Sequence, residues 1–194
     1  MDSGCVDFCT EGRGRGRESL VMSTDQRLQA IRTKLGHIDP VRPSGLLFEP
    51  HRQVDDVLYL SGELPFLGNK LPSEFLGSVE REVTIENASK AAEFATLNLL
   101  FSAQAAIGSL DNIDRVIEAF GYISSSESFF DQSVVMNACS SLLLDVFGKD
   151  RGQHTRGAIG VYCLPLRSCI EIKMILHLDC VGIASSVQAS REIE

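Results

Sequence analysis

The chain lacks any apolar run that approaches the length of about 18 residues needed for a transmembrane helix. The segment 1–22 also lacks the apolar core of a secretory signal peptide. We therefore predict a soluble, cytoplasmic protein with no membrane partner. With 194 residues, 44% of them hydrophobic, the chain is long enough to form one compact domain with a sizeable core.

An excess of basic residues is also missing. Lysine and arginine total 18 against 26 aspartates and glutamates, and the formal net charge is −8. This charge repels phosphate backbones, which argues against nucleic acid as a partner. The Gly-Arg run at 12–17 has no aromatic residue for base stacking, so we interpret it as part of a disordered extension over 1–22.

Cysteine pairs with metal-binding spacing are absent. The six cysteines include no CxxC pair, and the histidines and cysteines do not follow the spacing of zinc sites. We therefore predict no metal site and reduced thiols. Cys163 and Cys169 flank a predicted turn but are expected to point to opposite faces of a sheet, so a disulfide between them is not expected.

Apolar periodicity predicts alternating strands and helices. The predicted helices are 23–35, 85–107 and a third that begins in the serine cluster 124–127 and ends at Gly148. The predicted strands are 57–61, 113–124 and a pair within 154–177. After Leu178 the periodicity is weak, which predicts a frayed tail over 179–194.

The pair within 154–177 carries the candidate chemistry. The break Leu164-Pro165-Leu166-Arg167 between two β-branched runs indicates a hairpin. If Gly160 lies opposite Glu171 across this hairpin, Arg156, Ala158 and Glu171 project from one face. A guanidinium and a carboxylate would then lie about 13 Å apart, with room for a small anion between them.

Several motifs in the chain occur together in one known family. They are HTRGAIGV at 154–161, LPL at 164–166, CIEI at 169–172 and LYLSGELP at 58–65. With these motifs the chain resembles the Rid family of enamine/imine deaminases, also called YjgF-like or L-PSP endoribonuclease-like proteins. The resemblance extends from about Arg27 to Leu178, so we predict one Rid-like domain over 23–178.

The resemblance implies roles for individual residues. Arg156 is implied to bind a substrate carboxylate. Glu171 is implied to orient the attacking water together with a backbone carbonyl near Ala158. Ser61 and Gly62 are implied to border the substrate cleft, and no metal or cofactor is implied.

Two positions depart from the family pattern. Phe48 stands where the family has a cleft tyrosine, so a hydroxyl group is missing. Glu63 stands where the family has glutamine, and its charge would oppose an anionic substrate if it faced the cleft.

The resemblance also implies a fold and an assembly. It implies a single-domain α/β (α+β) structure of the chorismate-mutase-like type, with a mixed six-stranded sheet and two long helices on one face. Family members associate as trimers with the cleft between subunits, so we expect a homotrimer. Apolar residues such as Ile159 and Phe120 fit this expectation, because two long helices can cover only one face of a sheet.

Three functions compete at this point. The first is hydrolysis of 2-imino or enamine acids to 2-keto acids and ammonia, with a small imino or keto acid as the ligand. The second is a non-catalytic trimer that binds ligands or protects against stress, which Phe48 and Glu63 would permit. The third, an endoribonuclease, is disfavoured by the acidic charge and by histidines that lie far apart in sequence.

Overall fold

The computed structural model describes residues 22–41, 45 and 47–179. The predicted extension 1–22 and tail 179–194 therefore lie outside the described residues, apart from Met22 and Asp179. The described part contains no helix that is both long and apolar enough to cross a membrane.

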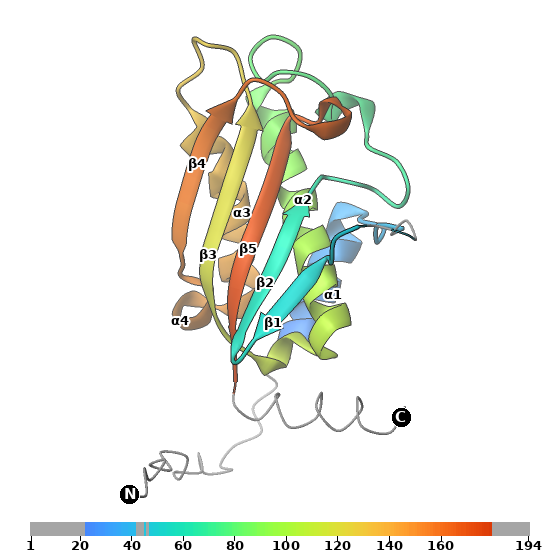
Figure 1. Cartoon of the computed structure of the whole chain (residues 1–194), viewed down its shortest axis with the longest axis vertical. Helices are drawn as coiled ribbons and strands as arrows, with labels where there is room; N and C mark the ends of the chain where they lie inside the picture. Colours follow the sequence, from blue (N-terminus) through green and yellow to red (C-terminus); the bar gives the residue numbers. More distant parts are fainter. Residues whose placement is uncertain (1–21, 42–44, 46, 180–194) are drawn as a thin grey trace, which may run out of the picture.

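The described chain contains five strands and four α-helices (Figure 1). The strands are β1 (His51–Val54), β2 (Val57–Glu63), β3 (Ile113–Ser124), β4 (Thr155–Val161) and β5 (Ile170–Leu178). The helices are α1 (Thr24–Leu35), α2 (Ile85–Ile107), α3 (Gln132–Phe147) and the single turn α4 (Lys149–Gly152). Three short 3-10 turns complete the order: η1 (Ser73–Phe75), η2 (Leu110–Asn112) and η3 (Pro165–Arg167).

The strands form one mixed sheet in the order β1-β2-β5-β3-β4. Strands β3 and β4 are parallel, and every other neighbouring pair is antiparallel. This is the predicted α+β fold, with five strands among the described residues where six were predicted.

Strands β4 and β5 are not neighbours, so the predicted hairpin is wrong. Strand β3 lies between them, with Tyr122 paired to Ile159 of β4 on one side and to Glu171 of β5 on the other. Because α3 connects β3 to β4, these two strands run parallel, as in a β-α-β unit. The connection from Tyr162 to Cys169 then passes the end of β3 to reach β5.

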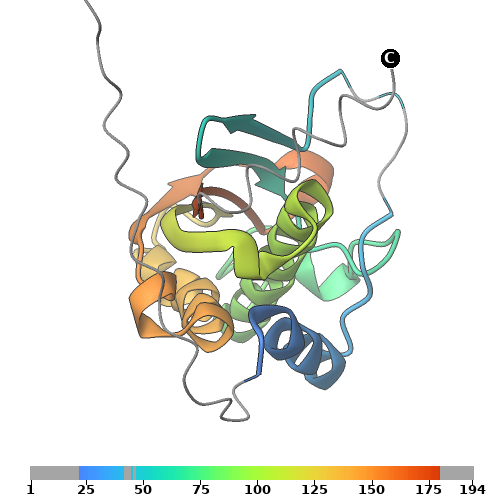
Figure 2. The same ribbon diagram turned by 90° about the horizontal axis from the view of Figure 1, so that it is seen from below.

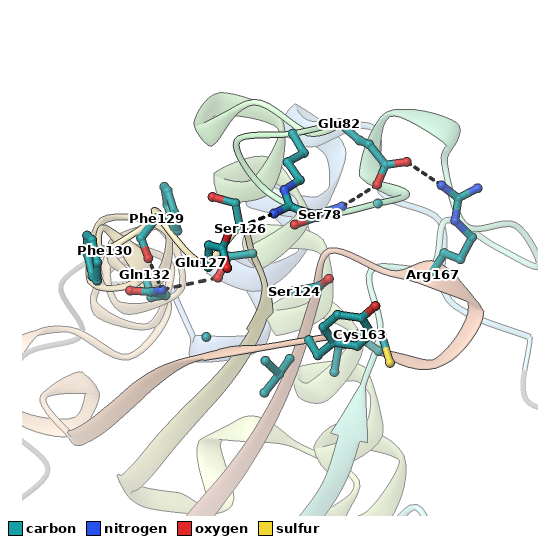
Figure 3. Close-up of a pocket in the computed structure, with 17 residues that line it drawn as sticks. Ser78, Glu82, Ser124, Ser126, Glu127, Phe129, Phe130, Gln132, Cys163 and Arg167 are labelled. Atoms are coloured by element: carbon teal, nitrogen blue, oxygen red, sulfur yellow. Dashed lines mark hydrogen bonds and ion pairs between the residues drawn. The ribbon is translucent and has the colours of Figure 1, made fainter.

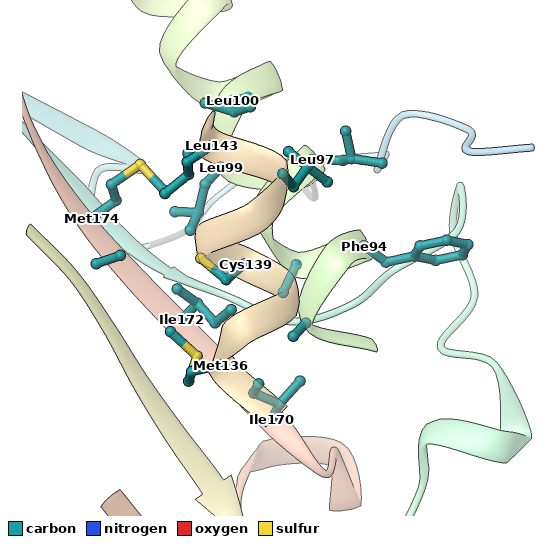
Figure 4. Close-up of a cluster of buried hydrophobic side chains, with 14 of the residues drawn as sticks. Phe94, Leu97, Leu99, Leu100, Met136, Cys139, Leu143, Ile170, Ile172 and Met174 are labelled. Atoms are coloured by element: carbon teal, nitrogen blue, oxygen red, sulfur yellow. The ribbon is translucent and has the colours of Figure 1, made fainter. Parts of the chain in front are cut away.

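Helices α2 and α3 lie side by side against one face of the sheet (Figure 2), as predicted. Figure 4 shows the core that this packing creates between the helices and β5. Its fully buried side chains include Ile170, Ile172 and Met174 of β5, and Met136, Cys139 and Leu143 of α3. Each such side chain contributes about 1.5 to 3 kcal/mol to folding through burial.

The two helices approach the sheet closely because small residues face it. On α2 the predicted alanine stripe is buried, including Ala88, Ala92 and Ala95. On β3, a Cβ atom at Gly121 would lie 2.3 Å from Sδ of Met136 on α3. Glycine at position 121 therefore leaves the space that Met136 fills.

The other face of the sheet, called the open face below, is not covered by any described helix. Tyr59 and Ile159 on this face are 46% and 44% exposed. The rings of Phe120 and Tyr122 lie 5.1 Å apart, and Nζ of Lys173 lies 5.4 Å from the Phe120 ring centre. Exposed aromatic and aliphatic residues gathered on one face are typical of an interaction surface.

The described cysteines are free thiols, and of the two that flank the 162–169 connection Cys163 is exposed and Cys169 buried. Burial raises the pKa of Cys139 to about 11 and that of Cys169 to about 12, so both stay protonated at neutral pH. No cluster of described residues could hold a metal ion. Cys5, Cys9 and Cys180 lie outside the described residues.

Candidate active site

The carboxyl group of Glu171 lies on the open face, directly against the backbone of Gly62. Glu171 is the second residue of β5, and its neighbours Ile170 and Ile172 are buried on the helix side. The pairing of β2 with β5 is irregular where Gly62 lies. A Cβ atom at Gly62 would lie 1.9 Å from Oε1 of Glu171. The carboxyl group thus occupies the space that a side chain at position 62 would need.

Burial raises the pKa of the Glu171 carboxyl above its ordinary value. The group is half-buried, and no hydrogen bond reaches it from the rest of the described chain. Tyr122 lies directly opposite on β3, and Ile159 lies beyond it on β4. A carboxyl in these surroundings exchanges its proton closer to neutral pH than an ordinary glutamate does, as general acids and bases require.

Arg156 lies on the helix side of β4, because its partner Ala119 is buried against the helices. Its Nη1 donates to Oδ1 of Asn137 at 2.9 Å and to Oγ of Ser140 at 3.2 Å, both on α3. These two bonds use both N–H groups of Nη1. The edge formed by Nε and Nη2 makes no hydrogen bond to other described residues and has the geometry that binds a carboxylate.

A histidine orients the hydroxyl group of Ser140. Nε2 of His154 lies 3.1 Å from Oγ of Ser140, and Nδ1 lies 2.7 Å from the carbonyl oxygen of Gly152. Because a carbonyl oxygen only accepts, we assign the proton of the neutral imidazole to Nδ1. Nε2 then accepts from Ser140, whose lone pairs remain available to Arg156.

Arg156 and Glu171 do not meet within one chain. Arg156 is in register with Ala119, whereas Glu171 is in register with Tyr122, and the two side chains leave opposite faces of the sheet. The predicted common face is therefore wrong, because it depended on a β4–β5 hairpin. Ala158 lies on the same side as Arg156 and packs against the core.

A separate pocket of about 680 Å³ opens at the end of the sheet where β3 and β4 finish (Figure 3). Three segments surround it: Gly77–Glu82, Ser124–Gln132 and Gly160–Arg167. Figure 3 shows Glu82 between Ser78 and Arg167, on the opposite side of the pocket from Phe130. The serine cluster at 124–127 was predicted to close β3 and to begin a helix, but α3 begins only at Gln132, and the cluster lines this pocket instead.

Comparison with known proteins identifies the family. The family model described as YjgF/chorismate mutase-like, putative endoribonuclease, matches residues 27–178. This chain belongs to the YjgF/chorismate mutase-like family. The match covers nearly all the described residues and agrees with the extent of the sequence resemblance.

Several similar proteins can be compared in detail. Protein TCP17 of Trypanosoma cruzi is 35% identical over 122 residues, which is 63% of this chain and 75% of that protein. The crystal structure of Atu1372 from Agrobacterium tumefaciens, a protein of unknown function, is 32% identical with a TM-score of 0.71 and covers 80% of this chain and 95% of its own. A putative endoribonuclease from Shewanella oneidensis is 26% identical with a TM-score of 0.73 and covers 81% of this chain and 100% of its own.

The other YjgF-like motif positions fall on both sides of the sheet. Ser61 donates its hydroxyl to the carbonyl of Glu49 at 2.7 Å, which ties the segment that carries the exposed Phe48 to β2. Glu63 pairs with Ile172, is 8% exposed and so lies on the helix side. Its charge therefore does not face the open side where Glu171 lies.

The residues that hold Arg156 were not predicted from the sequence. Asn137 and Ser140 are three positions apart on α3 and therefore share a face of that helix. That spacing was visible in the sequence, but the side of the sheet on which β4 presents Arg156 was not.

Proposed function

We propose that this YjgF-like protein hydrolyses 2-imino acids to 2-keto acids and ammonia. The observation that carries the proposal is Glu171, a half-buried carboxyl with a raised pKa that lies against the backbone of Gly62. Its proton-exchange chemistry fits a reaction in which water must lose a proton and a nitrogen must gain one.

The proposed reaction needs only this proton exchange. Water attacks C2 of the imine while Glu171 takes a proton from the water. Glu171 then gives that proton to the imine nitrogen. The resulting carbinolamine moves its hydroxyl proton to the nitrogen and expels ammonia, leaving the 2-keto acid. No redox partner is required, and the carboxylate of the substrate remains unchanged throughout.

Arg156 is proposed to hold that substrate carboxylate through the free edge of its guanidinium. Since Arg156 and Glu171 lie on opposite faces of one sheet, the arginine must come from a second copy of the chain. We therefore propose a homotrimer with its cleft between subunits. The uncovered aromatic and aliphatic residues of the open face support an assembly of this kind.

Light scattering at micromolar concentration should give about three times the 21.2 kDa chain mass. Ile159→Asp should reduce that mass, because it places a charge on the proposed interface. Val134→Asp is a matched control, since Val134 is 44% exposed on α3. A monomeric wild type, or equal masses for both variants, would contradict the assembly.

Gly62→Ala should lower the activity of the protein but leave its stability nearly unchanged. The added Cβ would displace the flexible end of Glu171 while leaving the core intact, so melting should change by no more than a few degrees. The displaced carboxyl should lower kcat about 10- to 100-fold, the cost of misplacing a reacting group by about 1 Å. In a Glu171→Gln background the same substitution should have no further effect on kcat, and an additive loss would show that Gly62 acts elsewhere.

The alternative is a trimer that binds an imino or keto acid without turning it over. Phe48 supports it, because a hydroxyl expected at this position from the family resemblance is missing. An assay of the lifetime of an imine decides between the two functions. An amino-acid-consuming enzyme releases the imine, and semicarbazide traps what remains of it. If the wild type never shortens the lifetime of the imine, the hydrolase proposal fails and the binding alternative remains.

A further inference from the structure

The pocket at the end of the sheet is separate from the proposed active site. Glu171, Gly62 and Arg156 are not among the residues that line it. Its volume of about 680 Å³ lies within the range of small-molecule sites. It therefore has room for a ligand of its own.

Hydrogen bonds and uncommon backbone angles occur in the loops that form the walls of the pocket. Glu80, Leu166 and Arg167 adopt positive φ angles of 76°, 55° and 60°, an uncommon conformation for residues other than glycine. Cross-links hold these loops together: Nη2 of Arg167 donates to Oε1 of Glu82 at 2.6 Å, and the backbone N–H of Ser78 donates to Oε2 of Glu82 at 2.9 Å. Strained residues held in this way are typical of preformed functional sites.

Two polar side chains that line the pocket, Ser124 and Gln132, keep hydrogen-bonding capacity that other described residues do not use. Ser124 is only 5% exposed, lines the pocket, and its hydroxyl makes no hydrogen bond within the described part of the chain. Gln132 donates its amide to the carbonyl of Phe129 at 2.7 Å and to Oγ of Ser125 at 3.4 Å, which leaves the amide oxygen of Gln132 available. Both groups are therefore open to a hydrogen bond from a water molecule or a ligand in the pocket.

The charges that line the pocket cancel. Arg167 pairs with Glu82, and Arg81 lies 3.8 Å from Glu127. Next to the pocket, hydrogen bonds from Ser126 and Ser128 lower the pKa of the Glu80 carboxyl, so it is charged at neutral pH. The surroundings are thus neutral to slightly negative and disfavour an anionic ligand.

Two features indicate the chemistry of the ligand. Phe130 and Tyr162 line the pocket and are 84% and 95% exposed, so each offers a flat apolar surface for stacking. The Arg167–Glu82 pair places donors and acceptors side by side, which suits two neighbouring hydroxyl groups, one accepting from the guanidinium and one donating to the carboxylate.

We propose that this pocket binds a neutral ring that carries neighbouring hydroxyl groups, as a free sugar or as the ribose of a nucleoside. The ring stacks on Phe130 or Tyr162, and its hydroxyl groups bond to the Arg167–Glu82 pair and to Ser124.

Titrations of the full-length protein followed by two-dimensional ¹H–¹⁵N NMR test this proposal. The probes are methyl riboside, methyl glucoside, adenosine, 2′-deoxyadenosine and adenosine monophosphate, at millimolar concentrations. Amide signals of Ser124–Gln132 and Gly160–Arg167 should shift with at least one neutral diol. Removal of one hydroxyl in 2′-deoxyadenosine, or addition of charge in the monophosphate, should weaken binding. Tighter binding of adenosine than of methyl riboside identifies a nucleoside, and the reverse identifies a sugar.

Two variants and two controls sharpen the test. Phe130→Ala, at a highly exposed position, should fold normally and weaken binding about 3- to 10-fold through loss of stacking. Arg167→Ala should weaken the binding of the probes that carry two neighbouring hydroxyl groups more than it weakens the binding of 2′-deoxyadenosine. Leu144→Ala on α3 and Glu171→Gln in the proposed active site should bind as the wild type does. Absence of shifts with every probe, shifts centred on Glu171, or equal binding of adenosine and 2′-deoxyadenosine would each overturn the proposal, whatever the outcome of the imine assay.

Discussion

Glu171→Gln should lower kcat for imine hydrolysis by about 100-fold or more, because glutamine keeps the shape of the side chain but cannot exchange a proton. KM should change little, since the substrate carboxylate is assigned to Arg156. Glu118→Gln is a matched control, because it makes the same charge change on the open face, where Glu118 pairs with Ile175. Equal losses in both variants would mean that charge on this face matters more than proton exchange.

Glu171→Gln should affect stability in the opposite direction from activity. The folded pKa of Glu171 is raised by burial, so in the interval above the ordinary carboxyl value the folded state binds more protons than the unfolded state. The stability of the wild type should therefore fall as the pH rises through that interval and level off above the raised folded pKa. Glu171→Gln has no charge to bury and should be at least as stable at neutral pH. Denaturant titrations at several pH values should show that the difference in the free energy of unfolding between the two proteins increases as the pH rises.

Local patterns in the sequence predicted most of the elements, but they missed β1 and placed the start of α3 too early. The helix over 85–107 and the strand over 113–124 have the bounds that the sequence analysis gave, because caps and β-branched runs are encoded by neighbouring residues. The helix predicted over 23–35 begins one residue later, at Thr24, because Ser23 is its N-cap and forms a capping box with Gln26.

The pairing of β4 and β5 could not be predicted from the same patterns. A turn between two β-branched runs is compatible with a hairpin and with a connection that passes one strand, and the segment from Tyr162 to Cys169 is long enough for the second. The order strand, helix, strand from β3 through α3 to β4 was the stronger signal, because such units make parallel strands. Placing β4 beside β3 moves Arg156 to the helix side.

The candidate site was therefore predicted in its residues but not in its arrangement. The contact between Gly62 and Glu171 joins positions 109 residues apart in sequence, and it depends on the β2–β5 register. The two hydrogen bonds from Arg156 to Asn137 and Ser140, called the clamp below, depend on the register of α3 against β4. Neither register is set by local propensity, since long-range packing decides both.

The clamp suggests how Arg156 would bind its ligand. Asn137 and Ser140 occupy one nitrogen of the guanidinium, and His154 fixes the direction of the serine hydroxyl. A long exposed side chain otherwise loses about 2 kcal/mol of rotamer entropy when a ligand immobilises it. Because the clamp orders Arg156 in advance, part of this loss is avoided on binding.

Arg156→Lys should weaken binding of a 2-imino or 2-keto acid by about 1 to 3 kcal/mol, or about 5- to 150-fold. Lysine keeps the positive charge but loses the flat two-pronged donor and the bonds to the clamp. The loss should appear in kcat/KM for imine hydrolysis and in direct calorimetric titration with a 2-keto acid. Arg52→Lys is the control, since Arg52 is exposed on β1 at the far edge of the sheet.

Asn137→Ala and Ser140→Ala should each raise KM by a smaller factor with kcat nearly unchanged, and Ser140→Thr should restore most of the loss because it keeps the hydroxyl group. In an Arg156→Lys background neither alanine variant should weaken binding further, since the bonds they remove are already absent. Additive losses would show that Asn137 and Ser140 act by a route other than Arg156. Unchanged binding in Arg156→Lys itself would show that Arg156 does not bind the substrate carboxylate. The expected loss of kcat in Glu171→Gln would then still support proton exchange at Glu171.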